Sequence, residues 1–418
     1  MLRIRAFQGL SPAPQLVADV ACVPYDVVNR EESAALVEGN PHSLLHVDRA
    51  EIDLPSDTDP YSALVYETAR KNFERLQQEG ALVRESAPAV YLYQQRMGSH
   101  IQTGLAAVCH VDDYVHERAN NPNAHDIIKK HERTRQDKED DRTRLIGTLR
   151  ANTGPVFLTY RERPEIDAIV AEELQKPATF DFVAPDGIAH TVWRVSSQGV
   201  IQKLVKEFGE LPCSYVADGH HRTASAARVA LELRTKDPGA TSNKDYDWFL
   251  AVLFPANQLQ ILPYNRVVKD LNGNSPEAFL EAVGRAFDLK RNGSSKPTEP
   301  GQIRMYFGGS WYDLSWKPEP DADPISQLDV SALQDRVLAP VLGIDDPRTS
   351  KRVDFIGGIR GTEELVRLVD SGNAAVAFSM YPTTVDQLMA IADAGQIMPP
   401  KSTWFEPKLR SGLFVHTF

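Results

Sequence analysis

The chain has 418 residues, of which 42% are hydrophobic and 25% are charged, and its formal net charge is -11. This length exceeds one ordinary domain, and the composition is average for a folded globular protein. The negative charge disfavours nucleic acid and anionic lipid as partners, so an anionic ligand requires a local basic pocket. Because there is no run of 18 apolar residues and no secretory signal, we expect a cytoplasmic protein that does not bind a membrane.

The first 120 residues alternate short apolar runs with helical patterns, which predicts a mixed α/β domain. Residues 60–80 predict an amphipathic helix, because apolar residues recur on one face and Gly80 stands where a C-terminal cap belongs. Residues 89–95 and 103–111 predict strands. The three cysteines are far apart and form no CxxC pair, so we expect small buried hydrophobes rather than a metal or disulfide site: Cys22, Cys109 and Cys213.

Residues 129–144 contain no apolar side chain, and 12 of these 16 residues are charged. If this stretch is a continuous helix, one side of it carries His131, Thr134, Lys138, Asp141 and Leu145. Two interpretations stay open. The residues alone favour a solvated, charged helix. In the alternative the helix faces a ligand pocket, where Lys138 and Arg142 meet phosphate and Glu132 acts as a general base.

A strand, a tight turn and a helix are predicted in immediate succession further along the chain. Residues 213–217 are apolar, Asp218 and Gly219 form a turn pair, and an alanine-rich helix follows from His220 to about residue 234. The free N–H groups and the dipole at a helix start favour phosphate, and Gly219 allows close approach of the backbone. Arg222 can pair with phosphoryl oxygens. The pattern therefore predicts an anion site.

Asp218 in this segment could hold Mg²⁺ or accept a hydroxyl proton. The adjacent His220 and His221 make a poor two-histidine metal site, because neighbours on a helix point in different directions. The alternative is an ordinary helix start that Asp218 caps, with both histidines in surface hydrogen bonds.

The C-terminal part predicts a second α+β domain. Residues 270–276 and 292–300 are polar and rich in turn residues, which places a boundary near residue 270 and divides the chain into residues 1–270 and 271–418. Near the end, two prolines precede Lys401, Ser402 and Thr403, which could contact an anion or simply form a turn.

Several familiar catalytic devices are absent from the sequence. There is no GxGxxG after a predicted strand, no GxxxxGK[ST], no GxSxG and no HExxH. Dinucleotide oxidoreductases, P-loop NTPases, serine hydrolases and zincin proteases are therefore poorly supported.

Segments spread over nearly the whole chain resemble the DUF1015 family of bacterial and archaeal proteins. They are Val23-Pro24-Tyr25-Asp26-Val27-Val28, Asn40-Pro41, His131-Glu132-x-Thr134 with Lys138 and Asp141-Arg142, Asp218-Gly219-His220-His221-Arg222, and Met398-Pro399-Pro400-Lys401-Ser402-Thr403 with Pro407-Lys408 and Ser411-Gly412-Leu413. The family is described as ParB-like. Its Asp218–Arg222 box resembles that of the free serine kinases, which move a phosphoryl group between a nucleotide and the hydroxyl of free serine.

The resemblance implies a fold, a reaction and cofactors. The fold is a ParB- and serine-kinase-like mixed sheet in the N-terminal domain, with the second α+β domain contributing to the site. The reaction is phosphoryl transfer between ADP or ATP, with Mg²⁺, and a small amino acid, either serine or phosphoserine. Whether the protein forms a homodimer stays open.

The resemblance also implies roles for particular residues. Glu132 is the base for the serine hydroxyl, Asp218 binds Mg²⁺ or sets the phosphate geometry, and His220 and His221 complete the catalytic set. The implied nucleotide and phosphate contacts are His131, Thr134, Lys138, Arg142, Gly219 and Arg222, and the implied substrate contacts are Lys401, Ser402 and Thr403.

Two other functions stay open. One is a ParB-like switch that binds and hydrolyses a nucleotide to control a partner, without a small-molecule acceptor. A chromosome-partition role is disfavoured, because the chain is acidic and has no recognisable helix-turn-helix. The other is a non-catalytic scaffold, which requires the polar stripe of residues 131–141 to be solvated.

Overall fold

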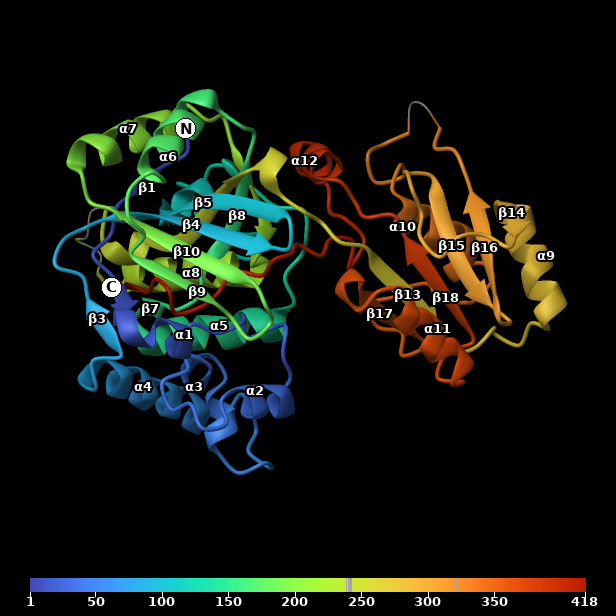
Figure 1. Ribbon diagram of the computed structural model, residues 1–418, viewed down its shortest axis with the longest axis horizontal. Helices are drawn as coiled ribbons and strands as arrows, with labels where there is room; N and C mark the ends of the chain where they lie inside the picture. The colour runs from blue at the N-terminus through green and yellow to red at the C-terminus, as the bar shows by residue number, and fades with distance from the viewer. Residues whose placement is uncertain (120, 238, 240–242, 320–321) are drawn as a thin grey trace. The chain divides into compact units, whose positions relative to one another are not determined.

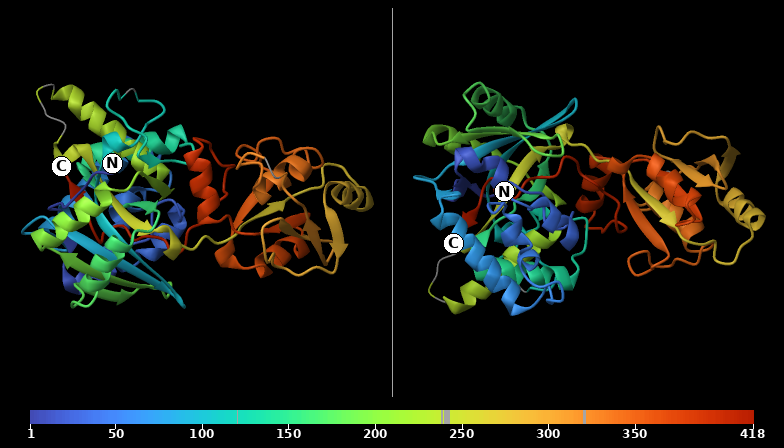
Figure 2. Two further views of the ribbon diagram at one scale, coloured as in Figure 1. Left: turned by 90° about the horizontal axis from the view of Figure 1, so that it is seen from above. Right: turned by 60° about the horizontal axis from the view of Figure 1, so that its bottom comes forward.

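The computed structural model describes residues 1–119, 121–237, 239, 243–319 and 322–418. The chain divides into two compact units, one formed by Met1–Leu259 with Pro407–Phe418 and the other by Gln260–Glu406. The closing residues return to the first unit, where Val415 pairs with Leu10 (Figures 1 and 2). The division differs from the expected boundary at residue 270, because the strand that precedes this point belongs to the second unit and the chain end belongs to the first.

The first unit is built on a large mixed sheet (Figure 1). In sheet order its strands are β6 (Ile128–Lys129), β11 (Ser214–Asp218), β8 (Val156–Tyr160), β12 (Trp248–Pro255), β5 (His100–His110), β4 (Val90–Met97), β10 (Ala189–Val195) and β9 (Phe180–Val183), with β1 (Ile4–Arg5) beside β5. β6 pairs with β11 and β8 with β12 in parallel, and the other neighbours are antiparallel. Every residue of β12 is buried, which explains its continuous apolar sequence.

The helices of the first unit contribute to its two larger apolar cores. α6 (Pro164–Glu173), α7 (Gln198–Gly209) and α8 (His220–Lys236) contribute side chains to the core that the central strands form. α5 (Gln136–Leu149) contacts α8 and also α4 (Ala63–Gln78), whose apolar face builds the second core. The smaller elements are α1 (Val17–Val20), α2 (Arg30–Leu36), α3 (Leu45–Asp48), β2 (Leu10–Pro12) paired with β3 (Leu82–Arg84), and β7 (Ala151–Asn152) paired with β19 (His416–Thr417).

The second unit is an antiparallel sheet with helices. Its strands, in order, are β14 (Asp288–Arg291), β16 (Ser310–Ser315), β15 (Gln302–Phe307), β18 (Val376–Met380), β13 (Tyr264–Val268) and β17 (Val353–Gly357). Its helices are α9 (Pro276–Ala286), α10 (Asp329–Leu333), α11 (Glu363–Asp370) and α12 (Val385–Asp393). The expected class is therefore confirmed: a mixed α/β region and a second α+β region.

The continuous helix considered for residues 129–144 is wrong. β6 ends at Lys129, and α5 begins only at Gln136. The residues between them leave the helical path because their backbone is held by other partners, as where the Arg135 N–H donates to His221 Nε2 at 3.0 Å. The solvated interpretation is also wrong for much of the stretch, since Glu139 is 0% exposed and Arg142 8% exposed.

Two further expectations can be compared with the structure. Cys22 and Cys109 are buried, as predicted, whereas Cys213 is only partly buried. In the described part of the chain, no helix combines the length and the apolar character needed to cross a bilayer.

Candidate functional site at the start of helix α8

The candidate site begins where β11 turns into α8. Gly219 makes this turn with φ +95°, a left-handed conformation that side chains rarely adopt. A Cβ at this position would lie 3.0 Å from Nε of Arg222, so the guanidinium covers the glycine closely. Asp218 does not cap the helix as considered above. Gly219 is the N-cap residue, and as a glycine it makes no side-chain capping hydrogen bond to the first turn. The helix start therefore keeps its affinity for an anion.

Lys408 brings a second positive charge to this turn from the end of the chain. Its Nζ lies 3.1 Å from Oδ2 of Asp218, whose Oδ1 accepts the Gly219 N–H at 2.8 Å. Burial would raise the pKa of the Asp218 carboxyl, but the charges of Lys408 and Arg222 hold that pKa well below its usual range. Asp218 is therefore an anion that fixes Lys408 beside the helix start.

The buried side chain of Arg222 is only partly satisfied. One terminal nitrogen donates to the carbonyl of Pro155, while Nε finds no hydrogen-bond partner within the described residues. Arg222 also lines a pocket with Arg142, Asp48 and Ser411. A guanidinium with an unused donor is suited to bind an anion.

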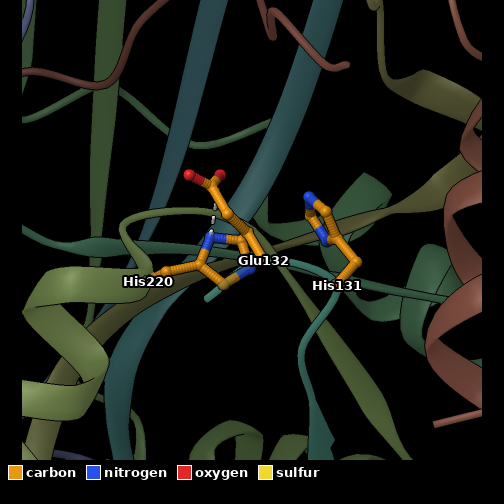
Figure 3. A group of neighbouring side chains, drawn as sticks. All are labelled: His131, Glu132 and His220. Carbon is orange, nitrogen blue, oxygen red and sulfur yellow. Dashed lines mark ion pairs between the residues drawn. The ribbon is translucent and has the colours of Figure 1, made fainter. Parts of the chain in front are cut away.

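The charged segment that begins at His131 meets the segment 218–222, because β6 and β11 are parallel neighbours in the sheet. Lys129 is paired with Tyr215, so His131, just beyond the end of β6, lies at the same edge of the sheet as Asp218, the last residue of β11. The His131 and His220 rings lie edge to face with their centroids 4.5 Å apart. Glu132 Oε2 is 4.0 Å from His220 Nδ1 (Figure 3). The structure thus brings together two motifs that lie almost 90 residues apart in the sequence.

Burial keeps the histidines of this site neutral. It lowers the pKa of His131 to about 4, against the opposing charge of Asp218. It also lowers the pKa of His220 well below its usual range, with His131 adding to the effect, and it lowers that of His221. Near pH 7 these rings act as neutral donors and acceptors rather than as cations. Positive charge at the site comes from Lys408 and Arg222.

Thr134 belongs to a second cluster, which is centred on the buried carboxylate of Glu139 and shares a pocket with Glu132. Its hydroxyl donates to Glu139 Oε2 at 2.6 Å, and the same carboxylate is bound by Arg228 at 2.9 Å and by His116 at 3.0 Å. Nδ1 of His116 accepts the N–H of Arg118, so its Nε2 carries the proton and donates to Glu139. The sequence prediction gave Thr134 a phosphate role, whereas in the structure its hydroxyl is engaged by Glu139.

Lys138 and Arg142 line a polar pocket on the other side of α5. Arg142 forms an ion pair with Asp141 at 2.7 Å and lies over the ring of Tyr25, 4.0 Å from its centroid. Lys138 donates to the hydroxyl of Tyr61 at 3.1 Å. Arg142 is brought near Arg222, because both side chains line one further pocket, but Asp141 already neutralises its charge.

The predicted substrate residues near the chain end belong to the second unit. Ser402 is 6% exposed, and its hydroxyl donates to the carbonyl of Pro399 at 2.7 Å, which closes a turn. The carbonyl of Lys401 accepts from Arg266, and Thr403 is half-buried. Lys401 and Ser402 thus have structural contacts within their own unit, and their role in binding substrate stays a prediction.

Sequence reasoning missed two groups that contact this site. Lys408 belongs to the closing motif, where the sequence analysis assigned it no role. The signal that could have found it is its place in the Pro407-Lys408 pair of that motif. Asp48, which lines the Arg222 pocket and accepts from Thr153 at 2.6 Å, had no signal in the sequence.

The fold and the site define a mixed α/β protein with a buried polar site at a strand-to-helix turn. The sequence matches the family model described as "Protein of unknown function (DUF1015)" over residues 4–331. The chain therefore belongs to the DUF1015 family. No curated protein sequence is similar enough to match it.

Several solved structures are similar to this one. One is SbnI with a C-terminal truncation from Staphylococcus aureus, at 13% identity and a TM-score of 0.36, covering 74% of this chain and 87% of that one. Another is a free serine kinase mutant in complex with ADP, at 13% identity and a TM-score of 0.32, covering 69% and 90%. A third is a conserved hypothetical protein from Pyrococcus furiosus, at 12% identity and a TM-score of 0.34, covering 69% and 91%. Scores of this size carry no argument about function.

Proposed function

We propose that this protein transfers a phosphoryl group between a nucleotide and the hydroxyl of a small amino acid, with serine and phosphoserine as the two forms. One observation carries the proposal: the half-exposed carboxylate of Glu132 lies beside His220 at the start of α8, where Arg222 and Lys408 supply positive charge. Phosphoryl transfer needs positioned phosphate oxygens, charge neutralisation and an oriented hydroxyl. The site has residues suited to each task.

The phosphate groups are assigned to the helix start. Its first-turn N–H groups and dipole favour an anion, and Nε of Arg222 is a buried donor without a partner in the described chain. Lys408, held by Asp218, adds a point charge that stabilises the equatorial oxygens as the bond breaks. His221 takes part as a neutral donor through Nδ1, because its Nε2 accepts the Arg135 N–H.

Glu132 is assigned to the acceptor hydroxyl. Its side chain is 49% exposed, so a substrate can reach it, whereas the neighbouring His220 ring is buried. In the forward direction the carboxylate accepts the proton of the serine hydroxyl as the oxygen attacks phosphorus, and in the reverse direction it returns that proton. His220 is a positioning residue, because its Nδ1 faces the Glu132 carboxylate.

Magnesium does not fit Asp218 in this arrangement. Both carboxylate oxygens already accept hydrogen bonds, and a cation there would lie beside the ammonium of Lys408. The nearest other side chains include the two imidazoles, whereas Mg²⁺ prefers oxygen ligands. Mg²⁺ therefore enters the proposal only as the counter-ion that a nucleotide brings with it, and no step depends on it.

The test is phosphorus NMR of the purified chain with Mg²⁺ in two mixtures, serine with ATP and phosphoserine with ADP. Transfer is expected in at least one mixture, and Glu132→Gln should slow it roughly 100- to 10,000-fold. Glu162→Gln, which removes an exposed carboxylate beyond β8, is the matched control and should leave the rate unchanged.

Two results would contradict the proposal. One is the lack of transfer in both mixtures while the nucleotide still binds or is slowly hydrolysed, which would favour the switch instead. The other is full transfer activity in Glu132→Gln, which would remove Glu132 from the reaction.

A further inference from the structure

Three potential metal ligands meet beside the helix start. One nitrogen of His131, one of His220 and one carboxylate oxygen of Glu132 all lie within 4.8 Å of one another (Figure 3). His131 and Glu132 follow β6, and His220 is the first residue of α8, so two separate elements fix the group. These three residues are called the open cluster below.

The histidines of the open cluster are buried but poorly satisfied. His131 is 2% exposed and His220 4% exposed. Within the described residues, three ring nitrogens make no hydrogen bond of normal geometry: Nδ1 and Nε2 of His131, and Nε2 of His220. The Val216 backbone lies close enough to His131 to raise its pKa slightly, which can fix the orientation of the ring. Buried polar atoms without partners are rare in folded proteins and call for a ligand.

We infer that His131, Glu132 and His220 hold a divalent first-row transition metal of the Zn²⁺ or Mn²⁺ class. Two imidazoles and one carboxylate are ligands that such ions prefer, whereas Mg²⁺ selects oxygen. The rings are neutral near pH 7, so their lone pairs are available without loss of a proton.

The ligand spacing agrees with a site that closes around its ion. Ligand atoms about 2.0 to 2.2 Å from a zinc ion lie roughly 3.3 to 3.6 Å apart in a tetrahedral arrangement, so separations of up to 4.8 Å must shorten by as much as about 1.5 Å. Most of this movement falls to the Glu132 side chain, which is 49% exposed, since the two histidine rings are buried. Three protein ligands leave at least one coordination position open.

This inference goes beyond the proposed function and does not depend on it. The ion would bind before any nucleotide and in its absence. If both hold, an ion on Glu132 would occupy the carboxylate that accepts the hydroxyl proton. Zn²⁺ would then inhibit transfer rather than support it, whereas a nucleotide-bound Mg²⁺ would not.

The test uses Co²⁺ as a spectroscopic substitute, added to chelator-treated full-length protein without nucleotide. One Co²⁺ per chain is expected, with visible d–d absorption that one equivalent of Zn²⁺ abolishes. His131→Asn and Glu132→Gln should each weaken Co²⁺ binding at least about tenfold, since even outer-shell changes cost this much. Circular dichroism of the metal-free variants shows that they remain folded.

His125→Asn is the matched control, because His125 is an exposed histidine that lies outside the open cluster. Its Co²⁺ affinity should equal that of the wild type. Equal Co²⁺ binding in the wild type and in His131→Asn would overturn the inference. A strong thiolate-to-cobalt absorption band would also overturn it, because that band would place the ion on a cysteine such as Cys213. Because nucleotide and serine are absent, failure here leaves the transfer reaction standing.

Discussion

Two clusters in the first unit each place a buried histidine beside a glutamate, but their hydrogen bonds differ greatly. The first, called the paired cluster, consists of Glu139 with His116, Thr134 and Arg228. Each of these three residues contacts Glu139 with normal hydrogen-bond geometry. In the open cluster, Glu132 approaches His220 only to 4.0 Å. Among the described residues, both ring nitrogens of His131 and Nε2 of His220 make no hydrogen bond of normal geometry. The paired cluster has the features of a structural network, and the open cluster those of a ligand site.

The largest expected effect is in the paired cluster. Glu139→Gln removes a buried charge that His116 and Arg228 contact, and it replaces one of the two acceptor oxygens by an NH2 group that can only donate. The free energy of unfolding should fall by about 3 to 5 kcal/mol, as measured by urea denaturation at pH 7. Asp140→Asn, which alters a more exposed partner of Arg228, should cost less than about 1 kcal/mol. Equal losses in the two variants would show that Glu139 has no special structural role.

The second effect concerns pH and belongs to the open cluster. The folded pKa of His131 is about 4, below its usual 6.5, so the folded state disfavours the protonated ring. The stability linked to the neutral His131 ring is fully present above pH 6.5 and is lost as the pH falls toward 4. This loss lowers the free energy of unfolding by about 3 kcal/mol. Urea denaturation of the metal-free protein between pH 7 and pH 4 measures the loss.

The control for this pH effect is His131→Asn, because acidic groups elsewhere also weaken the fold at low pH. The difference in stability between wild type and His131→Asn should change by about 3 kcal/mol over this pH range. A pH-independent difference would show that the His131 ring is accessible to protons in the folded state.

The third effect lies at the turn between β11 and α8. Gly219→Ala places a side chain at φ +95° and brings a Cβ to 3.0 Å from Arg222, which should cost about 1 to 2 kcal/mol. Gly199→Ala in α7 meets open space and should stabilise the chain by roughly 0.5 to 1 kcal/mol. Urea denaturation of both variants gives the comparison, and a neutral Gly219→Ala would remove the argument that the turn requires glycine.

The sequence predicted this turn well because its parts are contiguous. β11, Gly219 and α8 follow one another, so local propensity and turn chemistry were enough. The position of Glu132 could not be predicted, since it depends on the parallel pairing of β6 with β11, and β6 has only two residues. The same limit applied to Lys408, which reaches Asp218 from the far end of the chain.

The buried charges of α5 show a second limit. A stretch without apolar residues suggested solvent, because charged side chains are rarely buried unless they are paired. Here the partners come from elsewhere in the chain, as Arg228 on α8 does for Glu139. A one-dimensional pattern records the polar character of such residues but not the tertiary partners that bury them.

The smallest expected effect compares one residue type in both clusters. His131→Leu replaces a ring without normal hydrogen bonds by an apolar side chain of similar size, so at pH 7 the metal-free protein should keep its stability within about 1 kcal/mol. His116→Leu deletes a donor to Glu139 and an acceptor of backbone N–H groups, and should cost roughly 1 to 3 kcal/mol. Urea denaturation in chelator measures both. If His131→Leu were the more damaging change, the open cluster would be structural, and the buried imidazoles would need another explanation than a ligand.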